Sequence, residues 1–89
     1  MTVSGRLAAQ VAAFRHQDLP ASIVERAKLF MLDTLAVAWA GSDAPGGAEV
    51  HAMFSAESST AQATAWAYGN RLNAGDAAFV NAATASALD

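Results

Sequence analysis

The sequence predicts an all-α fold, a small segment of about four helices, on two observations. Apolar residues recur at spacings of three and four through most of the chain, which is the period of helices that bury one face. Hydrophobic residues make up 54% of the chain and charged residues 15%, and the dominant type is alanine, the strongest helix former. The 89 residues suffice for one domain, residues 1–89, which buries only about 60–65% of its unfolded surface.

The first predicted helix covers residues 4–16. Leu7, Val11 and Phe14 form a one-sided apolar stripe there, and Ser4 is suited to be the N-cap because a serine side chain accepts a hydrogen bond from the first turn. The helix should end before Pro20, since the residue that precedes a proline is pushed out of helical conformation.

The second predicted helix covers residues 20–41. Pro20 suits its first turn, where no backbone N–H is needed, and Gly41 suits its end. Residues 29–40 are apolar nearly all round, which predicts a buried core helix. This stretch contains Asp33 and is far shorter than the roughly 20 residues that cross a bilayer.

A third helix is predicted from Ser42 or Asp43, ahead of Pro45, to about Ala56. The polar run Glu57-Ser58-Ser59-Thr60 that follows should end it.

Residues 61–68 alternate between alanine and larger side chains, which predicts a short extended segment, and Gly69-Asn70 predicts a turn. The last helix should begin at Ala74, with Asn73 as its N-cap and Asp76 near the positive helix end. No stop signal follows, so this helix is expected to continue to the last residue.

The charge pattern argues against several function classes. The formal charge is −3, and no window gathers enough Lys or Arg to follow a phosphate backbone, so no nucleic acid partner is expected. There is no cysteine and therefore no disulfide or thiolate metal site. Neither a signal peptide nor a membrane span is predicted, and the expected location is the cytoplasm.

Three ionisable residues are candidates for chemistry. His16 lies at a predicted helix end and His51 lies within a predicted helix; their separation fits no metal-ligand spacing, and structural roles are favoured. Asp33 sits in an apolar run, where an unpaired carboxylate is costly to bury. A hydrogen-bonded acid that fixes helix packing is favoured over a functional site.

Glycines and aromatic residues add no reaction. Gly46-Gly47 follows no phosphate-loop pattern and predicts a turn. Trp39, Trp66 and Tyr68 are expected to be core or interface residues. No metal or cofactor site is predicted from the residues alone.

Several phrases, taken in order, resemble the N-terminal domain of the MmgE/PrpD family, which includes 2-methylcitrate dehydratase, cis-aconitate decarboxylase and an iminodisuccinate epimerase. The phrases are the helix from Leu7 to Phe14, Asp18-Leu19-Pro20 with Val24 to Lys28, Leu32-Asp33-Thr34-Leu35 with Ala40-Gly41-Ser42, Ala63-Thr64-Ala65-Trp66 with Gly69, Asp76 to Asn81, and Ala87-Leu88-Asp89. Each phrase is weak alone, but their shared order covers nearly the whole chain.

The resemblance implies a large helical domain, a smaller α+β domain and a cleft between them for cofactor-free reactions on small polycarboxylates. It implies one catalytic-site residue, Asp89, which aligns with the first aspartate of the family's "LDFDD" phrase. Two residues depart from the family pattern: Ser86 stands where histidine is common, and Ala82 stands where glycine is common.

Two hypotheses follow from the sequence. The first is an N-terminal fragment of a 2-methylcitrate dehydratase-like lyase, truncated or completed by a second polypeptide, inactive alone and binding a polycarboxylate only when completed. The second is a small helical interaction or oligomerisation module that keeps the family scaffold without its chemistry. Under the first hypothesis, exposed apolar helix faces should lead to self-association or to binding of a second chain, whereas a stable, soluble product would favour the second.

Overall fold

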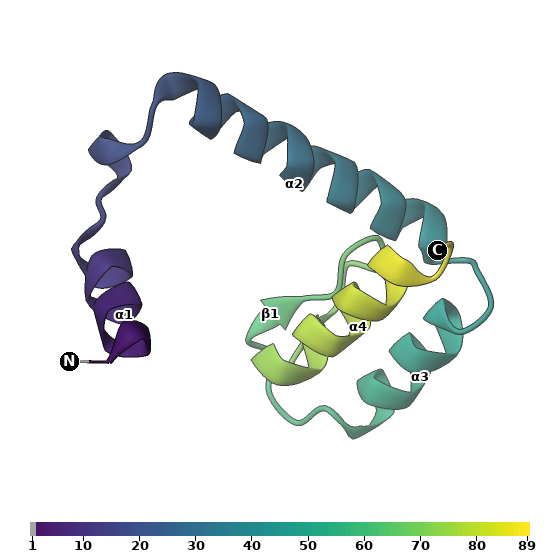
Figure 1. The fold of residues 1–89 in the computed structure, drawn as a ribbon. Coiled ribbons are helices and arrows are strands. Elements are labelled where there is room, and N and C mark those ends of the chain that lie inside the picture. The colour runs from purple at the N-terminus through teal and green to yellow at the C-terminus, as the bar shows by residue number, and fades with distance from the viewer. Residues whose placement is uncertain (1) are drawn as a thin grey trace.

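The computed structural model describes residues 2–89 and confirms the all-α class with four α-helices (Figure 1). In chain order the elements are α1 (Val3–Ala13), the 3₁₀-helix η1 (His16–Asp18), α2 (Ala21–Gly41), α3 (Gly47–Glu57), β1 (Ala63–Thr64), β2 (Arg71–Leu72) and α4 (Ala74–Ser86).

The chain divides into a packed body and an arm. The body consists of α3, the two short strands, α4 and the C-terminal end of α2, whereas the rest of α2 extends away from it and carries α1 at its far end (Figure 1). The principal extents are 44 × 28 × 22 Å. The radius of gyration is 16.6 Å, against about 12 Å for an ordinary domain of this length.

The core of the body is small and rich in alanine. Ala65, Leu72, Ala77 and Val80 form its buried cluster. Partly buried apolar side chains from α3 and the hairpin, namely Val50, Phe54, Ala63 and Tyr68, pack against that cluster. Alanine side chains remove little apolar surface from water, so this core contributes little free energy per residue.

The start of α1 differs from the prediction. Thr2 is the N-cap, and its hydroxyl oxygen accepts a hydrogen bond of 2.9 Å from the backbone N–H of Gly5. Ser4 therefore lies inside the helix, and its assignment as N-cap was wrong. Thr2 outcompetes it because it offers the same capping oxygen two residues earlier.

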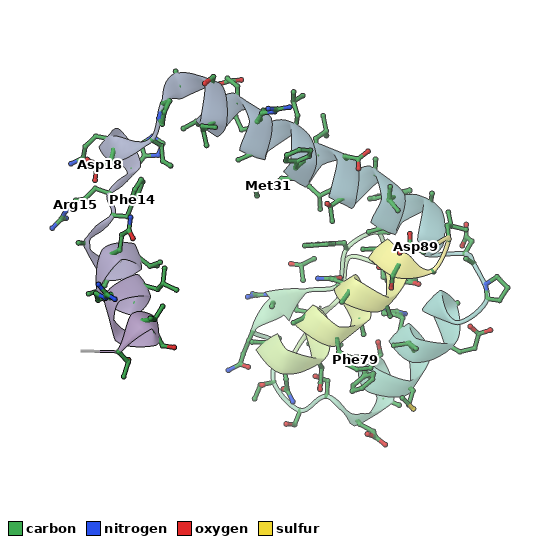
Figure 2. All side chains as sticks on the ribbon, in the orientation of Figure 1. Phe14, Arg15, Asp18, Met31, Phe79 and Asp89 are labelled. Atoms are coloured by element: carbon green, nitrogen blue, oxygen red, sulfur yellow. The ribbon has the colours of Figure 1, made fainter. Side chains whose placement is uncertain are left out.

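The end of α1 also differs, since the helix stops at Ala13 and not at His16. The Asp18 carboxylate accepts a hydrogen bond of 2.9 Å from the backbone N–H of Arg15 and thereby closes the separate turn η1 (Figure 2). Such local bonds from aspartate compete with helix continuation.

The bounds of α2 agree with the prediction within one residue, because Pro20 is the N-cap and Gly41 is the last residue. The prediction of a buried core helix was wrong. Leu29, Phe30 and Met31 are each about two-thirds exposed, and only Ala38 and Gly41 are buried. Within residues 2–89, α4 packs only on the C-terminal end of α2, so the earlier turns have no covering element.

The start of α3 lies later than predicted. Gly46 is the N-cap with φ +95°, and the Glu49 carboxylate accepts a hydrogen bond of 2.8 Å from its N–H. The positive φ favours glycine at this position. Ser42 instead caps α2, and its hydroxyl donates to the carbonyl oxygen of Trp39 at 2.6 Å.

The predicted extended segment contains β1, which pairs with β2 as an antiparallel hairpin in which Ala63 faces Leu72 and Thr64 faces Arg71. The turn includes Gly69 at φ +87°, as the turn signal predicted. The strand β2 was not predicted. Two residues are too short for an alternating pattern to be recognised.

The last helix begins at Ala74 as predicted but ends at Ser86, three residues before the last residue. Asn73 occupies the N-cap position, yet its side chain does not cap the helix. Its Oδ1 accepts a hydrogen bond from the backbone N–H of Thr60 at 2.7 Å, and the Gln62 side chain accepts from the N–H of Ala74 instead. Tertiary contacts thus replace the local cap.

Candidate functional site

Asp89, the site residue implied by resemblance, lies exposed beyond the end of α4 (Figure 2). Its backbone N–H donates a hydrogen bond of 3.1 Å to the carbonyl oxygen of Ser86. The Ser86 hydroxyl donates to the carbonyl oxygen of Ala82 at 2.8 Å, one turn earlier on the same helix. The two departures from the family pattern are therefore joined by one hydrogen bond on an exposed face.

An apolar groove runs between α2, the hairpin and α4, and we call it the α2–α4 groove. Its lining residues are Phe30, Met31, Thr34, Leu35, Ala63, Thr64, Trp66, Ala74, Ala77, Ala78, Asn81, Ala82 and Ala85. None of these residues carries an acid or a base. The groove therefore offers shape and apolar surface but no group for proton transfer.

Asp33 is exposed on α2 and makes no hydrogen bond or ion pair within residues 2–89. The interpretation of a buried, hydrogen-bonded acid was wrong. That interpretation depended on burial of the second half of α2, which remains exposed. The desolvation that would make such a carboxylate costly therefore does not act on it.

The two histidines lie apart in the fold, His16 in η1 and His51 in α3. The ring of His51 stacks on Tyr68, with ring centroids 3.6 Å apart and an interplanar angle of 3°. Its Nε2 lies 2.7 Å from Oδ1 of Asn70, whose amide donates to the Ser55 hydroxyl at 3.1 Å. His51 thus joins the hairpin turn to α3.

Tyr68 continues this set of contacts to the end of α2. Its hydroxyl donates a hydrogen bond of 2.7 Å to the carbonyl oxygen of Ser42. Burial raises the pKa of the Tyr68 phenol, and the negative charges of Asp43 and Glu49 raise it further. From the sequence, Tyr68 is expected only to be a core or interface aromatic, and nothing in its spacing indicates this bond.

The raised pKa of Tyr68 predicts a loss of stability at alkaline pH. The folded state holds the phenol proton at pH values where the unfolded state has released it, so the free energy of unfolding falls above the ordinary phenol pKa of about 10. We expect Tyr68→Phe to remove this part of the pH dependence and to lower stability at pH 7 by about 1 kcal/mol. Urea unfolding at pH 7 and pH 10.5 measures both. An unchanged alkaline slope in Tyr68→Phe would contradict the assignment.

Asn81 is a buried polar residue that no sequence pattern singles out apart from the family phrase Asp76 to Asn81. Its Oδ1 accepts a hydrogen bond of 2.8 Å from the backbone N–H of Trp66, and its amide donates to the carbonyl oxygen of Thr64 at 3.1 Å. These two bonds fasten the hairpin to α4. The only sequence signal for this role of Asn81 is that a single asparagine lies among small residues of a predicted helix.

The remaining candidates are simple to place. Gly46 forms the turn before α3, as predicted. Trp39 is 67% exposed and Trp66 is 36% exposed, so neither belongs to the core of residues 2–89.

Among the described residues, no cluster of three or more His, Cys, Asp or Glu side chains could hold a metal ion. No described helix combines the length and the apolar character that a bilayer crossing requires.

Comparison with known proteins gives one match. No curated protein and no solved structure is detectably similar to the chain. The family model of the MmgE/PrpD N-terminal domain matches residues 5–89, which is nearly the whole sequence and includes every element from α2 to α4 in full. The chain therefore belongs to the MmgE/PrpD family, and its residues 5–89 match the N-terminal domain of that family.

Proposed function

We propose that this chain supplies the N-terminal helical part of a cofactor-independent lyase that acts on small polycarboxylates in the manner of 2-methylcitrate dehydratase. The observation that carries the proposal is the family match over residues 5–89. The rest of the catalytic site would come from further polypeptide, in the same chain or in another.

We also propose that the chain is inactive alone, and the described residues support this. Removal of a proton next to a carboxylate needs a base, and a polycarboxylate needs cationic groups to hold it. The α2–α4 groove has neither. Asp89 is a lone exposed carboxylate with no cationic side chain bonded to it within residues 2–89.

We assign Asp89 to the completed site as a group that takes part in proton transfer or orients the base. A carboxylate repels a polycarboxylate anion, so a direct role in binding the substrate is disfavoured. In a dehydration the base removes a proton from carbon, and an acid protonates the hydroxyl group on the neighbouring carbon so that it leaves as water. The electron pair of the broken C–H bond forms the carbon–carbon double bond.

A chimera tests this function. Residues 5–89 would replace the corresponding N-terminal segment of a full-length 2-methylcitrate dehydratase, and the ultraviolet absorbance of the unsaturated product would report the turnover of 2-methylcitrate. We expect a folded, active chimera in which Asp89→Asn lowers kcat at least about tenfold, with a smaller change in KM. The isolated 89-residue chain should show no turnover.

Glu57→Gln is the matched control, because Glu57 is another exposed carboxylate at the end of a helix and far from Asp89 in the sequence. It should leave kcat unchanged. A chimera that folds, as judged by circular dichroism, but has no activity would reject the lyase function and favour the non-catalytic interaction module. An active chimera that is indifferent to Asp89→Asn would reject only the role of Asp89.

A further inference from the structure

The end of α2, the start of α3 and the last turn of α4 meet in a three-helix junction, which consists of Gly41, Gly47 and Thr84. A Cβ atom on Gly41 would lie 2.0 Å from the carbonyl oxygen of Thr84. A Cβ atom on Gly47 would lie 2.5 Å from the carbonyl oxygen of Gly41 and 3.4 Å from Cγ2 of Thr84. Each of the three residues therefore lies against the other two, where the ends of α2 and α4 come together (Figure 1).

Thr84 is the fully buried side chain of this junction, with 0% of its surface exposed. Its hydroxyl donates a hydrogen bond of 3.1 Å to the carbonyl oxygen of Asn81 in the same helix. Because the hydroxyl is satisfied within α4, the methyl group of Thr84 makes the contact with Gly47. All atoms of the junction belong to residues 41–84, so its geometry does not depend on any further polypeptide.

The junction holds the turn of α4 that leads to Asp89 (Figure 2). The carbonyl oxygen of Thr84 accepts a hydrogen bond of 3.4 Å from the N–H of Ala87, and the carbonyl oxygen of Ser86 accepts one of 3.1 Å from the N–H of Asp89. A Cβ atom on Gly41 would also lie 3.3 Å from Cβ of Ala87. A displacement of the backbone at Thr84 is therefore passed on to Asp89 through one turn of bonded chain.

A side chain at Gly41 would displace this turn by a distance that matters for catalysis. Carbon and oxygen atoms that are not bonded stay about 3.3 Å apart, so the Thr84 oxygen would have to move by roughly 1 Å away from an alanine Cβ. A misplacement of about 1 Å in a reacting group can lower a rate about a hundredfold.

We propose that Gly41, Gly47 and Thr84 are positioning residues for Asp89, because their junction fixes the last turn of α4 and thereby the place of the Asp89 carboxylate in the completed lyase site. This inference rests on the proposed function. None of the three side chains carries an acid or a base, so their effect on the reaction passes through Asp89.

A double-mutant cycle in the chimera that carries residues 5–89 tests this role. Gly41→Ala should lower kcat at least about tenfold, with a smaller change in KM, because the cationic groups that hold the substrate would come from other parts of the enzyme. In the Asp89→Asn background, Gly41→Ala should lower kcat no further, since the group through which it acts is already lost. Gly75→Ala is the matched control, because a Cβ atom there meets no other atom within 4 Å, and it should leave kcat unchanged.

A pair of substitutions at Thr84 provides the test if circular dichroism shows that Gly41→Ala prevents folding. Thr84→Val retains the methyl group that faces Gly47 and should keep the kcat of the unsubstituted chimera. Thr84→Ala removes that methyl group and should lower kcat at least about threefold. Leu72→Val changes a buried side chain of β2 outside the junction. It should lower the melting temperature and leave kcat unchanged, which separates loss of stability from misplacement of Asp89.

The outcomes distinguish this inference from the proposed function. A folded chimera without activity would reject the lyase function and, with it, the positioning role. An active chimera that responds to Asp89→Asn but not to Gly41→Ala or Thr84→Ala would overturn the positioning role alone. An equal loss of kcat in the presence and absence of the Asp89 carboxylate would also overturn it, because the junction would then act on stability and not through Asp89.

Discussion

Gly41→Ala should destabilise the fold by about 3 kcal/mol or more, the larger of the two strongest effects that we expect. A Cβ atom at Gly41 would lie 2.0 Å from the carbonyl oxygen of Thr84 and 3.3 Å from Cβ of Ala87. The 2.0 Å neighbour is backbone in the last turn of α4, so the clash is relieved only if α2 and α4 move apart. The melting temperature should fall by more than about 12 °C, as measured by circular dichroism.

Gly75→Ala is the matched control for this substitution. Gly75 lies in the first turn of α4, and a Cβ atom there would meet no other atom within 4 Å. Alanine is the better helix former, so this variant should be neutral or more stable by up to about 1 kcal/mol. If Gly41→Ala and Gly75→Ala melted at the same temperature, the close approach of α2 and α4 would be refuted.

Asn81→Ala should lower the free energy of unfolding by about 2–4 kcal/mol, because it leaves two backbone groups without partners. The N–H of Trp66 and the carbonyl oxygen of Thr64 both bond the Asn81 side chain, which is 8% exposed. Loss of both bonds frees the hairpin from α4. Urea unfolding at pH 7 measures the change.

Ser86→Ala on the same helix provides the comparison for Asn81→Ala. The Ser86 hydroxyl bonds only carbonyl oxygens of its own helix and is exposed. Its removal should change stability by less than about 0.5 kcal/mol. An equally small effect at Asn81 would mean that water satisfies the two backbone groups and that the hairpin is held by apolar contacts.

Local signals in the sequence were sufficient for much of this fold. Pro20 and Gly41 delimit α2 because proline lacks an N–H and glycine ends helices, and neither property depends on the rest of the protein. Ala74 begins α4 where the capping pattern placed it. The helical class itself follows from the period of the apolar residues.

Features that depend on tertiary contact were not predictable in the same way. Asn73 has the sequence signature of a capping residue, but its side chain accepts a hydrogen bond from the backbone N–H of Thr60 in the preceding loop and does not cap the helix. The apolar second half of α2 predicted burial, yet burial requires a neighbour, and residues 2–89 provide one only at its end. An apolar stretch of sequence predicts that a surface is buried, but it does not identify the element that buries it.

The residues of the candidate site were likewise not predictable from local sequence signals, because their roles depend on tertiary contacts. Asp89 was identified as a site residue only by family resemblance, because a single exposed carboxylate has no local sequence signature of catalysis. Asn81, Tyr68 and His51 form contacts across 15 or more residues of sequence, and no spacing rule for helices or strands relates positions so far apart.

The close packing at Gly41 has a mechanical consequence. The helix α2 is a rod of 21 residues, about 32 Å long, and it is clamped to the body at one end only. A pivot of about 5° at that clamp moves the far end of α2, which leads to α1, by roughly 3 Å. Gly41 has no side chain, so the backbones of α2 and α4 can lie in contact. This contact fixes the direction of α2 and therefore the position of α1.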